Sequence, residues 1–245
     1  MDIERERMSM NEAGPSDSLL ARLRSIDTPS VCNAIEVAQG MRGFAAYTRD
    51  TPLSSDPESP AVVGLAATAV IAGYEPPADA PDVLKARRLE YFRYMAAAPS
   101  PAVAVIEDAD HPRCAGAWWG EVHTAVHQSL GLSGALTNGA IRDLGDLAAG
   151  FPVIAGSVSP SHAFVHVREM GTPVTVFGLT VSPGDLVHAD RHGAVVVPDS
   201  VWSTLESAID RMYATEQLIL GPARQSGFDI DALEAAWSAF ERARI

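Results

Sequence analysis

The residues with the clearest chemical potential lie in the segment from Gly134 to Leu144, GALTNGAIRDL. An apolar run ends there at Asn138-Gly139, a pair that favours a tight turn, and Arg142 and Asp143 follow it. Arginine presents a planar fork of donors to a carboxylate, and aspartate is a hard oxygen ligand for Mg²⁺ or Mn²⁺. We predict that the pair begins a helix and binds an anionic substrate and a metal. The alternative is that Asp143 only caps this helix and Arg142 pairs with a surface acid.

A second candidate segment, AWWGEVH, lies upstream and ends at His123. Gly120 would let a ligand approach the backbone closely, and the free N–H groups at the start of the next helix could receive a carboxylate. Glu121 lies in the first turn of that helix, where a negative charge is favourable even without a function. The sequence leaves both interpretations of Glu121 open.

The histidines give weaker indications of chemistry. His123 and His127 have a spacing that could bind a metal on one helical face, but the residues between them lack the glutamate of the metalloprotease pattern. Asp190 has a histidine two residues away on each side, so a straight strand would direct three possible ligands to one face. The glycine that follows favours instead a turn held by hydrogen bonds. Four histidines keep no assigned role: His162, His166, His188 and His192.

The elements that must position these residues alternate between helices and apolar strands. Helical patterns cover residues 18–26, 28–40, 84–98, 121–130, 142–149 and 200–220, and a last apolar stripe contains Ile230, Leu233, Trp237 and Phe240. Strand patterns cover residues 62–72, 102–107, 134–137 and 152–155, with a β-rich stretch over 172–197 that contains runs at 174–177, 185–188 and 194–197. These elements predict a mixed α/β fold.

Composition limits the class of protein. The 245 residues carry a formal net charge of −13, which argues against nucleic-acid or anionic-membrane partners because both need clustered positive charge. Cys32 and Cys114 cannot build a disulfide framework, and we interpret them as small core residues. The longest apolar run, residues 61–73, is shorter than the roughly 18 residues of a membrane span. Since the charged N-terminus lacks the apolar core of a signal peptide, we expect a soluble cytoplasmic protein.

Several segments occur in the order of one known family. The chain resembles the RraA-like family, named for a regulator of ribonuclease E activity, which also contains the 4-hydroxy-4-methyl-2-oxoglutarate aldolases. The resemblance covers roughly residues 28–221 and implies a layered α/β/β/α fold, homotrimers or dimers of trimers (homohexamers), and active sites between adjacent subunits. The segments that carry it are Gly120-Glu121, Gly134 to Leu144, Phe151-Pro152-Val153, Pro183-Gly184-Asp185-Leu186 and Asp190 to Pro198.

The resemblance also implies roles for individual residues. Asp143 matches the aspartate that ligates a divalent metal in the aldolases, and Arg142 matches the arginine that holds the carboxylate of the pyruvyl unit. Glu121 would reach the metal through water, and Glu216 is the best match for a glutamate that a neighbouring subunit adds to the metal's water shell. The substrate-binding residues would be Arg142, Gly120, Val122, His123, Thr124 and Ala125.

The chain also departs from the family pattern. Many relatives have aspartate where this chain has Asn138, and residues 75–98 resemble an insertion. We expect a leader without order over residues 1–17 and a single RraA-like domain over 18–221. Residues 222–245 would form a C-terminal helix that packs on its own or a neighbouring subunit.

These observations predict a lyase that depends on Mg²⁺ or Mn²⁺ and cleaves a C–C bond of a small-molecule 2-oxo acid. The reaction would be retro-aldol cleavage of a 4-hydroxy-2-oxo acid or decarboxylation of oxaloacetate, since both pass through a pyruvate enolate. Arg142, Asp143 and Glu121 would carry the catalysis. The alternative is a non-catalytic regulator that binds an RNA-degrading enzyme.

Overall fold

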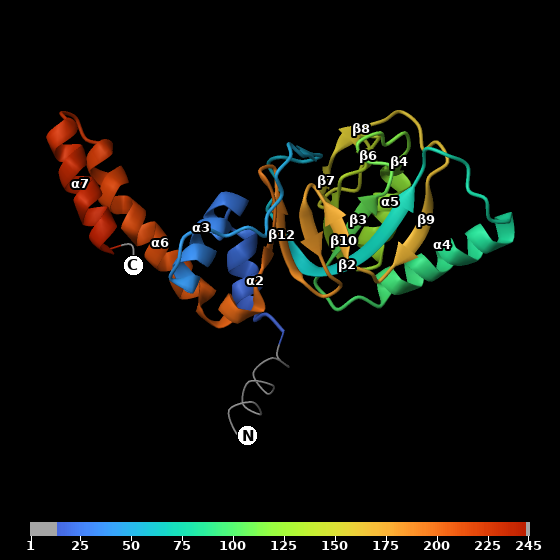
Figure 1. Cartoon of the computed structure of the whole chain (residues 1–245), viewed down its shortest axis with the longest axis horizontal. Coiled ribbons are helices and arrows are strands. Elements are labelled where there is room, and N and C mark those ends of the chain that lie inside the picture. The colour runs from blue at the N-terminus through green and yellow to red at the C-terminus, as the bar shows by residue number, and fades with distance from the viewer. Residues whose placement is uncertain (1–13, 244–245) are drawn as a thin grey trace, which may run out of the picture. The chain divides into compact units, whose positions relative to one another are not determined.

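An eight-stranded mixed sheet lies at the centre of residues 46–198 in the computed structural model, which describes residues 14–243 (Figure 1). Its strands are β1 (Leu53–Ser54), β2 (Val62–Ala72), β3 (Ala102–Asp108), β5 (Leu132–Thr137), β7 (Val153–Ala155), β9 (His166–Met170), β12 (Leu186–Asp190) and β13 (Gly193–Val197). They pair in the order β1-β7-β5-β3-β2-β12-β13, and β9 also pairs with β2. The neighbours β2, β3, β5 and β7 are parallel, whereas the remaining pairs are antiparallel.

Both faces of this sheet are covered, which explains why β2 and β3 are buried along almost their whole length. One face packs against α4 (Pro81–Ala96) and α5 (Glu121–Ser129) in an apolar cluster that includes Tyr91, Trp119 and Phe151. The other face packs against the antiparallel hairpin of β10 (Val174–Val176) and β11 (Leu179–Val181). The layered arrangement of helices and strands confirms the predicted fold class.

A small parallel sheet of β4 (Ala117–Trp119), β6 (Ala140–Ile141) and β8 (Ser157–Val158) lies beside the large one. β4 leads through Gly120 directly into α5, and β6 leads directly into Arg142. Because parallel strands bring their carboxyl ends to the same edge, the pairing of β4 with β6 brings Glu121 and Asp143 together, which are 22 residues apart in the chain.

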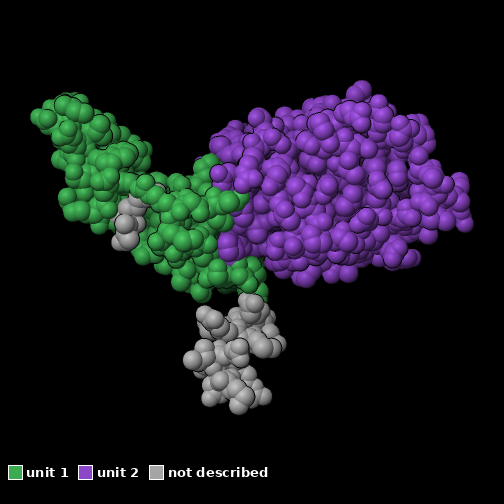
Figure 2. Space-filling model, viewed as in Figure 1, with its two compact units in different colours: residues 1–22, 29–45, 199–245 green, residues 23–28, 46–198 purple. Residues whose placement is uncertain are grey.

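The chain divides into two compact units, which Figure 2 colours separately. Unit 2 contains residues 23–28 and 46–198, and the described residues of unit 1 are 14–22, 29–45 and 199–243. The helices of unit 1 come from α2 (Asp17–Arg24), α3 (Thr28–Gln39), the 3₁₀ turn η1 (Asp199–Val201), α6 (Trp202–Ala223) and α7 (Ile230–Ala243). Polar bonds join α2 to α6, from Ser18 to Glu206 and from Arg22 to Asp210.

The C-terminal helix α7 packs against α6 by only part of its apolar stripe. Ala236 is buried, whereas Trp237 is 50% exposed and Ile230 is 64% exposed. The amphipathic helix predicted at the C-terminus is therefore present, and unit 1 covers its apolar side only in part.

Most predicted elements are confirmed, with ends that differ by a few residues. The helix predicted over 142–149 is wrong: this segment forms turns, because Asp143 adopts a left-handed conformation (φ 56°) that a right-handed helix does not contain. The sequence patterns also missed five short strands, β1, β4, β6, β8 and β9, and gave no separate run for β11 inside the predicted β-rich stretch. Residues 1–13 of the predicted leader lie outside the described residues, and the domain boundaries stay a prediction.

None of the helices within residues 14–243 combines the length and the hydropathy of a membrane-spanning segment.

Candidate active site

The start of α5 and the end of β6 form the centre of the candidate site. The Arg142 amide donates to the Trp119 carbonyl over 2.9 Å, so the hydrogen bonding between β4 and β6 extends to Arg142. Gly120 is the N-cap of α5, in an extended conformation. The chain thus brings Gly120 and Glu121 next to Arg142 and Asp143 without any helix between residues 142 and 149.

The Asp143 carboxylate caps α5 from a distant position in the sequence. Its Oδ2 accepts a hydrogen bond from the Glu121 amide over 3.1 Å and lies 3.4 Å from Arg142 Nε. A Cβ atom at Gly120 would lie 2.5 Å from the same oxygen, so only glycine leaves room for the carboxylate here. Asp143 is therefore a cap, as one alternative proposed, but it caps α5 rather than a helix of its own.

The surroundings of the Asp143 carboxylate are electropositive. The positive end of the α5 dipole and the Arg142 guanidinium both lie beside Asp143. Within residues 14–243, Oδ1 of Asp143 has no hydrogen-bond partner, and the side chain is 36% exposed. One oxygen is thus used to hold the loop in place, and the other is available to a ligand.

The predicted substrate-binding residues on α5 divide into exposed and buried ones. Glu121 and Ala125 are exposed, and Val122 is 66% exposed. Thr124 is fully buried: its hydroxyl donates to the Gly120 carbonyl and accepts from the Ala148 amide, each over 3.0 Å. Thr124 therefore fastens the loop after Asp143 to the start of α5, whereas its neighbours present the accessible face.

The two histidines of α5 belong to an aromatic cluster rather than to a metal site. His127 Nδ1 donates to the His123 carbonyl over 2.6 Å, and its Nε2 accepts from the Tyr91 hydroxyl over 2.7 Å. Burial lowers the pKa of His127 to about 4, and burial also raises the pKa of Tyr91, so both groups are neutral at physiological pH. Since both nitrogens of His127 are used, the i, i+4 metal pair is not formed.

His123 lies between this cluster and the site. Its ring meets the Trp118 ring edge to face, with centroids 4.2 Å apart, and its Nδ1 is buried without a hydrogen-bond partner within residues 14–243. Burial, followed by the proximity of His127, Arg88 and Arg142, lowers its pKa to about 3. Sequence patterns gave no sign that Arg88 lies within electrostatic reach of the site.

Asn138, where many relatives have aspartate, has a structural role that an aspartate could not fill in the same way. Its side-chain oxygen accepts from the Asp108 amide over 2.7 Å, and its side-chain nitrogen donates to the Asp108 carbonyl over 3.4 Å. Burial raises the pKa of the Asp108 carboxyl. The amide thereby joins the ends of β3 and β5 directly before the turn that leads to Arg142.

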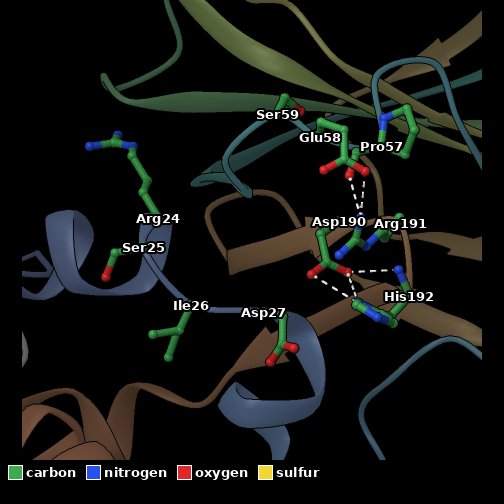
Figure 3. Close-up of a pocket in the computed structure, with 10 residues that line it drawn as sticks. All are labelled: Arg24, Ser25, Ile26, Asp27, Pro57, Glu58, Ser59, Asp190, Arg191 and His192. Carbon is green, nitrogen blue, oxygen red and sulfur yellow. Dashed lines mark hydrogen bonds and ion pairs between the residues drawn. The ribbon is translucent and has the colours of Figure 1, made fainter.

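His188 and Asp190 lie in β12, and the chain turns directly after them at residues 191–192, as the glycine indicated. Asp190 Oδ1 accepts from the His192 amide over 2.8 Å. The buried His188 ring bonds through Nδ1 to the Thr28 hydroxyl and through Nε2 to the Leu23 carbonyl. Figure 3 shows the small polar pocket beside this turn, with Asp190 directed toward His192 and Arg191 directed toward Glu58. Within the described range, 14–243, no group of three His, Cys, Asp or Glu side chains is arranged to hold a metal ion, so the three-ligand alternative is excluded there.

Three further predicted or unassigned side chains lie elsewhere. Glu216 lies on α6 in unit 1, where it lines an apolar hollow with Ile219, Leu220 and Phe240. Its role toward a neighbouring subunit stays a prediction. The rings of His162 and His166 bond to nearby backbone carbonyls of Ala163 and Phe164.

The sequence matches known proteins over most of its length. The RraA-like family model, described as Aldolase/RraA, matches residues 28–196. The chain belongs to the RraA-like family. A protein of Halalkalibacterium halodurans named "Putative 4-hydroxy-4-methyl-2-oxoglutarate aldolase" is 28% identical over 181 residues, which are 73% of this chain and 76% of that protein. Protein DlpA of Legionella pneumophila is 28% identical over 112 residues, but these span only 17% of its length and 43% of this chain.

Solved structures share the fold of this chain. An uncharacterized protein from Pseudomonas syringae has a TM-score of 0.65 and 22% identity, covering 95% of this chain and 100% of that one. Streptomyces coelicolor RraAS2, described as an unusual member of the RNase ES inhibitor RraA protein family, has a TM-score of 0.63 and 23% identity, covering 87% of this chain and 99% of its own. The proteins similar to this chain thus include one named as a putative aldolase and one described as a member of an RNase ES inhibitor family.

Proposed function

We propose that this protein is a lyase that depends on a divalent metal and cleaves a C–C bond of a 2-oxo acid. The observation that carries the proposal is the Asp143 carboxylate, which is held at the start of α5 beside Arg142 and keeps one oxygen without a protein partner within residues 14–243. Membership in a family that includes a protein named as an aldolase supports the same reaction class.

The donor set fits Mg²⁺ or Mn²⁺ better than a softer metal. Asp143 offers a free carboxylate oxygen. Glu121, whose backbone amide donates to Asp143, adds a second, exposed carboxylate. Mg²⁺ is commonly held by one or two carboxylates and keeps several waters, so it does not need a cage of three protein ligands. When bound, such an ion supplies Lewis-acid stabilisation of the negative charge that develops on the 2-oxo oxygen.

The chain's own residues would orient the substrate and share this charge. Arg142 approaches Asp143 through Nε, so the terminal nitrogens of its guanidinium could form a bidentate pair with the substrate carboxylate. The amides of Val122 and His123 belong to the first turn of α5, where backbone donors lack intrahelical acceptors. Together these donors would stabilise the enolate that both retro-aldol cleavage and oxaloacetate decarboxylation produce.

Pyruvate release from a panel of 4-hydroxy-2-oxo acids and oxaloacetate, with Mg²⁺ or Mn²⁺ and then with EDTA, tests the proposal. We expect release that EDTA abolishes, and a loss of at least about 100-fold in Asp143→Ala. Asp146→Ala is the matched control, because Asp146 is also exposed and lies three residues further along the same loop. Full metal-dependent turnover in Asp143→Ala would refute this site.

Assembly is part of the same proposal. Exposed apolar side chains lie next to the site residues: Val122 at 66% and Leu144 at 50%. A trimer or a dimer of trimers would cover such side chains and could bring Glu216 of a neighbouring copy to the metal's water shell. Light scattering should then give a mass of three or six times 25.9 kDa. A monomer with full activity would exclude any role for Glu216 in trans.

The family's regulators supply the second function class. If no 2-oxo acid on the panel is cleaved, and the protein captures a ribonuclease stoichiometrically, binding of an RNA-degrading enzyme replaces the lyase as the function.

A further inference from the structure

The loop that carries the candidate site, residues 142–149, has no helix or strand of its own and must be held by its neighbours. Asp143 has a left-handed backbone (φ 56°), a conformation that persists in a non-glycine residue only where surrounding contacts maintain it. Within the loop, the Asp146 amide donates to the Asp143 carbonyl over 2.9 Å. This turn alone does not fix the Asp143 side chain, so contacts with other segments must do so.

One end of the loop lies at the start of α5. The Glu121 amide donates to Asp143 Oδ2 over 3.1 Å, and the Arg142 amide donates to the Trp119 carbonyl over 2.9 Å. Residues 144–146, which follow, are exposed. They would let the loop move away from α5 if its other end were free.

Two side chains of α5 fasten this other end. The Thr124 hydroxyl accepts from the Ala148 amide over 3.0 Å, and Gln128 Nε2 donates to the Ala149 carbonyl over 2.7 Å. Thr124 and Gln128 are four residues apart in a helix, so their side chains lie on the same face. The loop is therefore bonded to one helix at both of its ends.

Thr124 also links the two attachments directly. It is fully buried, and its hydroxyl oxygen lies 3.0 Å from the Gly120 carbonyl and 3.0 Å from the Glu121 carbonyl, which can accept its hydrogen. Gly120 leaves room for the Asp143 carboxylate, and the Glu121 amide is the donor that binds it. One hydroxyl thus joins the far end of the loop to the residues that receive Asp143.

We propose that Thr124 and Gln128 are positioning residues of the lyase site. They form a clamp that keeps the loop on α5, which holds Asp143 at the start of this helix with Oδ1 available to the metal ion. The inference rests on the proposed function and deepens it, because it names what controls the metal affinity of Asp143. It also assigns Thr124, to which the family resemblance gives a role in substrate binding, to the loop instead.

A third polar contact of α5 provides a matched control. The Tyr91 hydroxyl of α4 donates to His127 Nε2 over 2.7 Å, and both side chains are fully buried. The ring of His127 bonds to α4 and to its own helix, and within residues 14–243 none of its hydrogen bonds reaches the loop. Tyr91→Phe therefore removes a buried bond of α5 and leaves the clamp in place.

Amide hydrogen exchange, followed by NMR on the full chain without metal, tests the clamp independently of any reaction. In Thr124→Val, which keeps the shape of the side chain and removes the hydroxyl, we expect the Glu121 amide to exchange about tenfold faster. Gln128→Met should give a smaller increase, about threefold, because this contact is exposed to water. Thr124→Ser restores the hydroxyl and should restore the rate, and Tyr91→Phe should leave it within about twofold.

Calorimetry with Mn²⁺ alone, without substrate, measures the consequence for the metal. Loss of a group that holds a metal ligand in place commonly weakens binding by about tenfold or more, so the Kd in Thr124→Val should rise about tenfold. Tyr91→Phe should bind Mn²⁺ as the unaltered protein does, although both variants lose a buried hydrogen bond. A merely structural role for Thr124 would instead give the two variants the same Kd.

The outcomes separate the clamp from the lyase. Unchanged exchange of the Glu121 amide in Thr124→Val and Gln128→Met would overturn the inference and leave the lyase proposal standing. Equal acceleration in Tyr91→Phe would also overturn it, since the effect would then follow from lost stability alone. If Thr124→Val does not fold, Gln128→Met decides the question, because Gln128 is exposed. Faster exchange in the clamp variants of a protein that binds no Mn²⁺ and releases no pyruvate would confirm the clamp and refute the lyase.

Discussion

An aspartate lies next to an arginine at two strand ends of this protein, and the two arrangements differ. After β6, Asp143 bonds to one amide and keeps Oδ1 without a partner within residues 14–243. At the last residue of β12, both oxygens of Asp190 are used, since Oδ2 accepts from the Thr28 amide over 2.9 Å and Oδ1 from the His192 amide over 2.8 Å. Arg142 forms an ion pair with the adjacent Asp143, whereas Arg191 forms its ion pair with Glu58 and not with Asp190.

The difference teaches which carboxylate is available for chemistry. A carboxylate whose oxygens both accept strong hydrogen bonds holds its loop together, and a ligand would have to break those bonds. A carboxylate with one free oxygen can hold its loop and bind a ligand simultaneously. The pair of an arginine and an aspartate therefore has a structural role at Asp190 and forms a candidate site at Asp143.

The largest effect should follow from filling the space that Asp143 occupies. In Gly120→Ala the new Cβ would lie 2.5 Å from Asp143 Oδ2, so the carboxylate must move away from the start of α5. We expect pyruvate release to fall by about 100-fold, because small displacements of a positioning group have large effects on rate. Gly221→Ala on α6 is the control, since no atom lies within 4 Å of its added Cβ. Unchanged turnover in Gly120→Ala would contradict the capped geometry.

The second prediction concerns stability at Asp190. Its side chain is only 11% exposed, so Asp190→Ala should leave the Thr28 and His192 amides unpaired and lower the free energy of unfolding by about 1–3 kcal/mol. Urea denaturation at pH 7 measures this loss. Pyruvate release should stay within about twofold, and a large loss of turnover would end the distinction between the two turns.

The pH dependence of stability sharpens the same contrast. Burial alone would raise the pKa of Asp190, but hydrogen bonds from Thr28 and His192 outweigh it and lower the pKa below 3.8. The stabilisation is therefore complete above about pH 4 and is lost as the pH falls through the lower, folded-state pKa. Between pH 4 and 2 the unaltered protein should lose more stability than Asp190→Asn. Parallel curves would show that Asp190 is not stabilised in its charged form.

A third region, the aromatic cluster behind α5, should respond at higher pH. The pKa of His127 is lowered from 6.5 to about 4, so the unfolded chain binds a proton in this interval and the folded one does not. Its contribution to stability is present above pH 6.5 and falls by up to about 1.4 kcal/mol per pH unit toward pH 4. Chemical denaturation of His127→Gln between pH 7 and 4 should show a shallower decline. An unchanged slope would place the titration elsewhere.

The smallest effect belongs to Arg191. Its ion pair with Glu58 is exposed, with 50% and 84% of the two side chains accessible, so Arg191→Gln should change stability by less than about 1 kcal/mol and leave turnover unchanged. Arg142→Gln, the matched change in the other turn, should reduce turnover strongly by weakening substrate binding. Similar kinetics in the two variants would remove the functional contrast.

Much of the fold could be predicted from local patterns. The strand predicted over 62–72 is β2, and the helix predicted over 121–130 is α5, because an apolar run and a helical periodicity are both written in neighbouring residues. The helix predicted over 142–149 failed at Asp143, whose left-handed backbone is stabilised by contacts with α5 that no local pattern contains. The short strands β4 and β9 were missed because each is defined by its pairing with a distant strand. β4 pairs with β6, and β9 pairs with β2.

The sequence by itself determined the chemical types available to this protein: an arginine and an aspartate after a glycine turn, a glutamate at a helix start, and too little positive charge for a nucleic-acid surface. Only the tertiary structure decided how these residues are used. The pairing of β4 with β6 sets Asp143 on the start of α5, and the packing of α4 on α5 joins Tyr91 to His127. Both depend on contacts between distant segments, whose free energy is realised only when the whole sheet and its covering helices are formed.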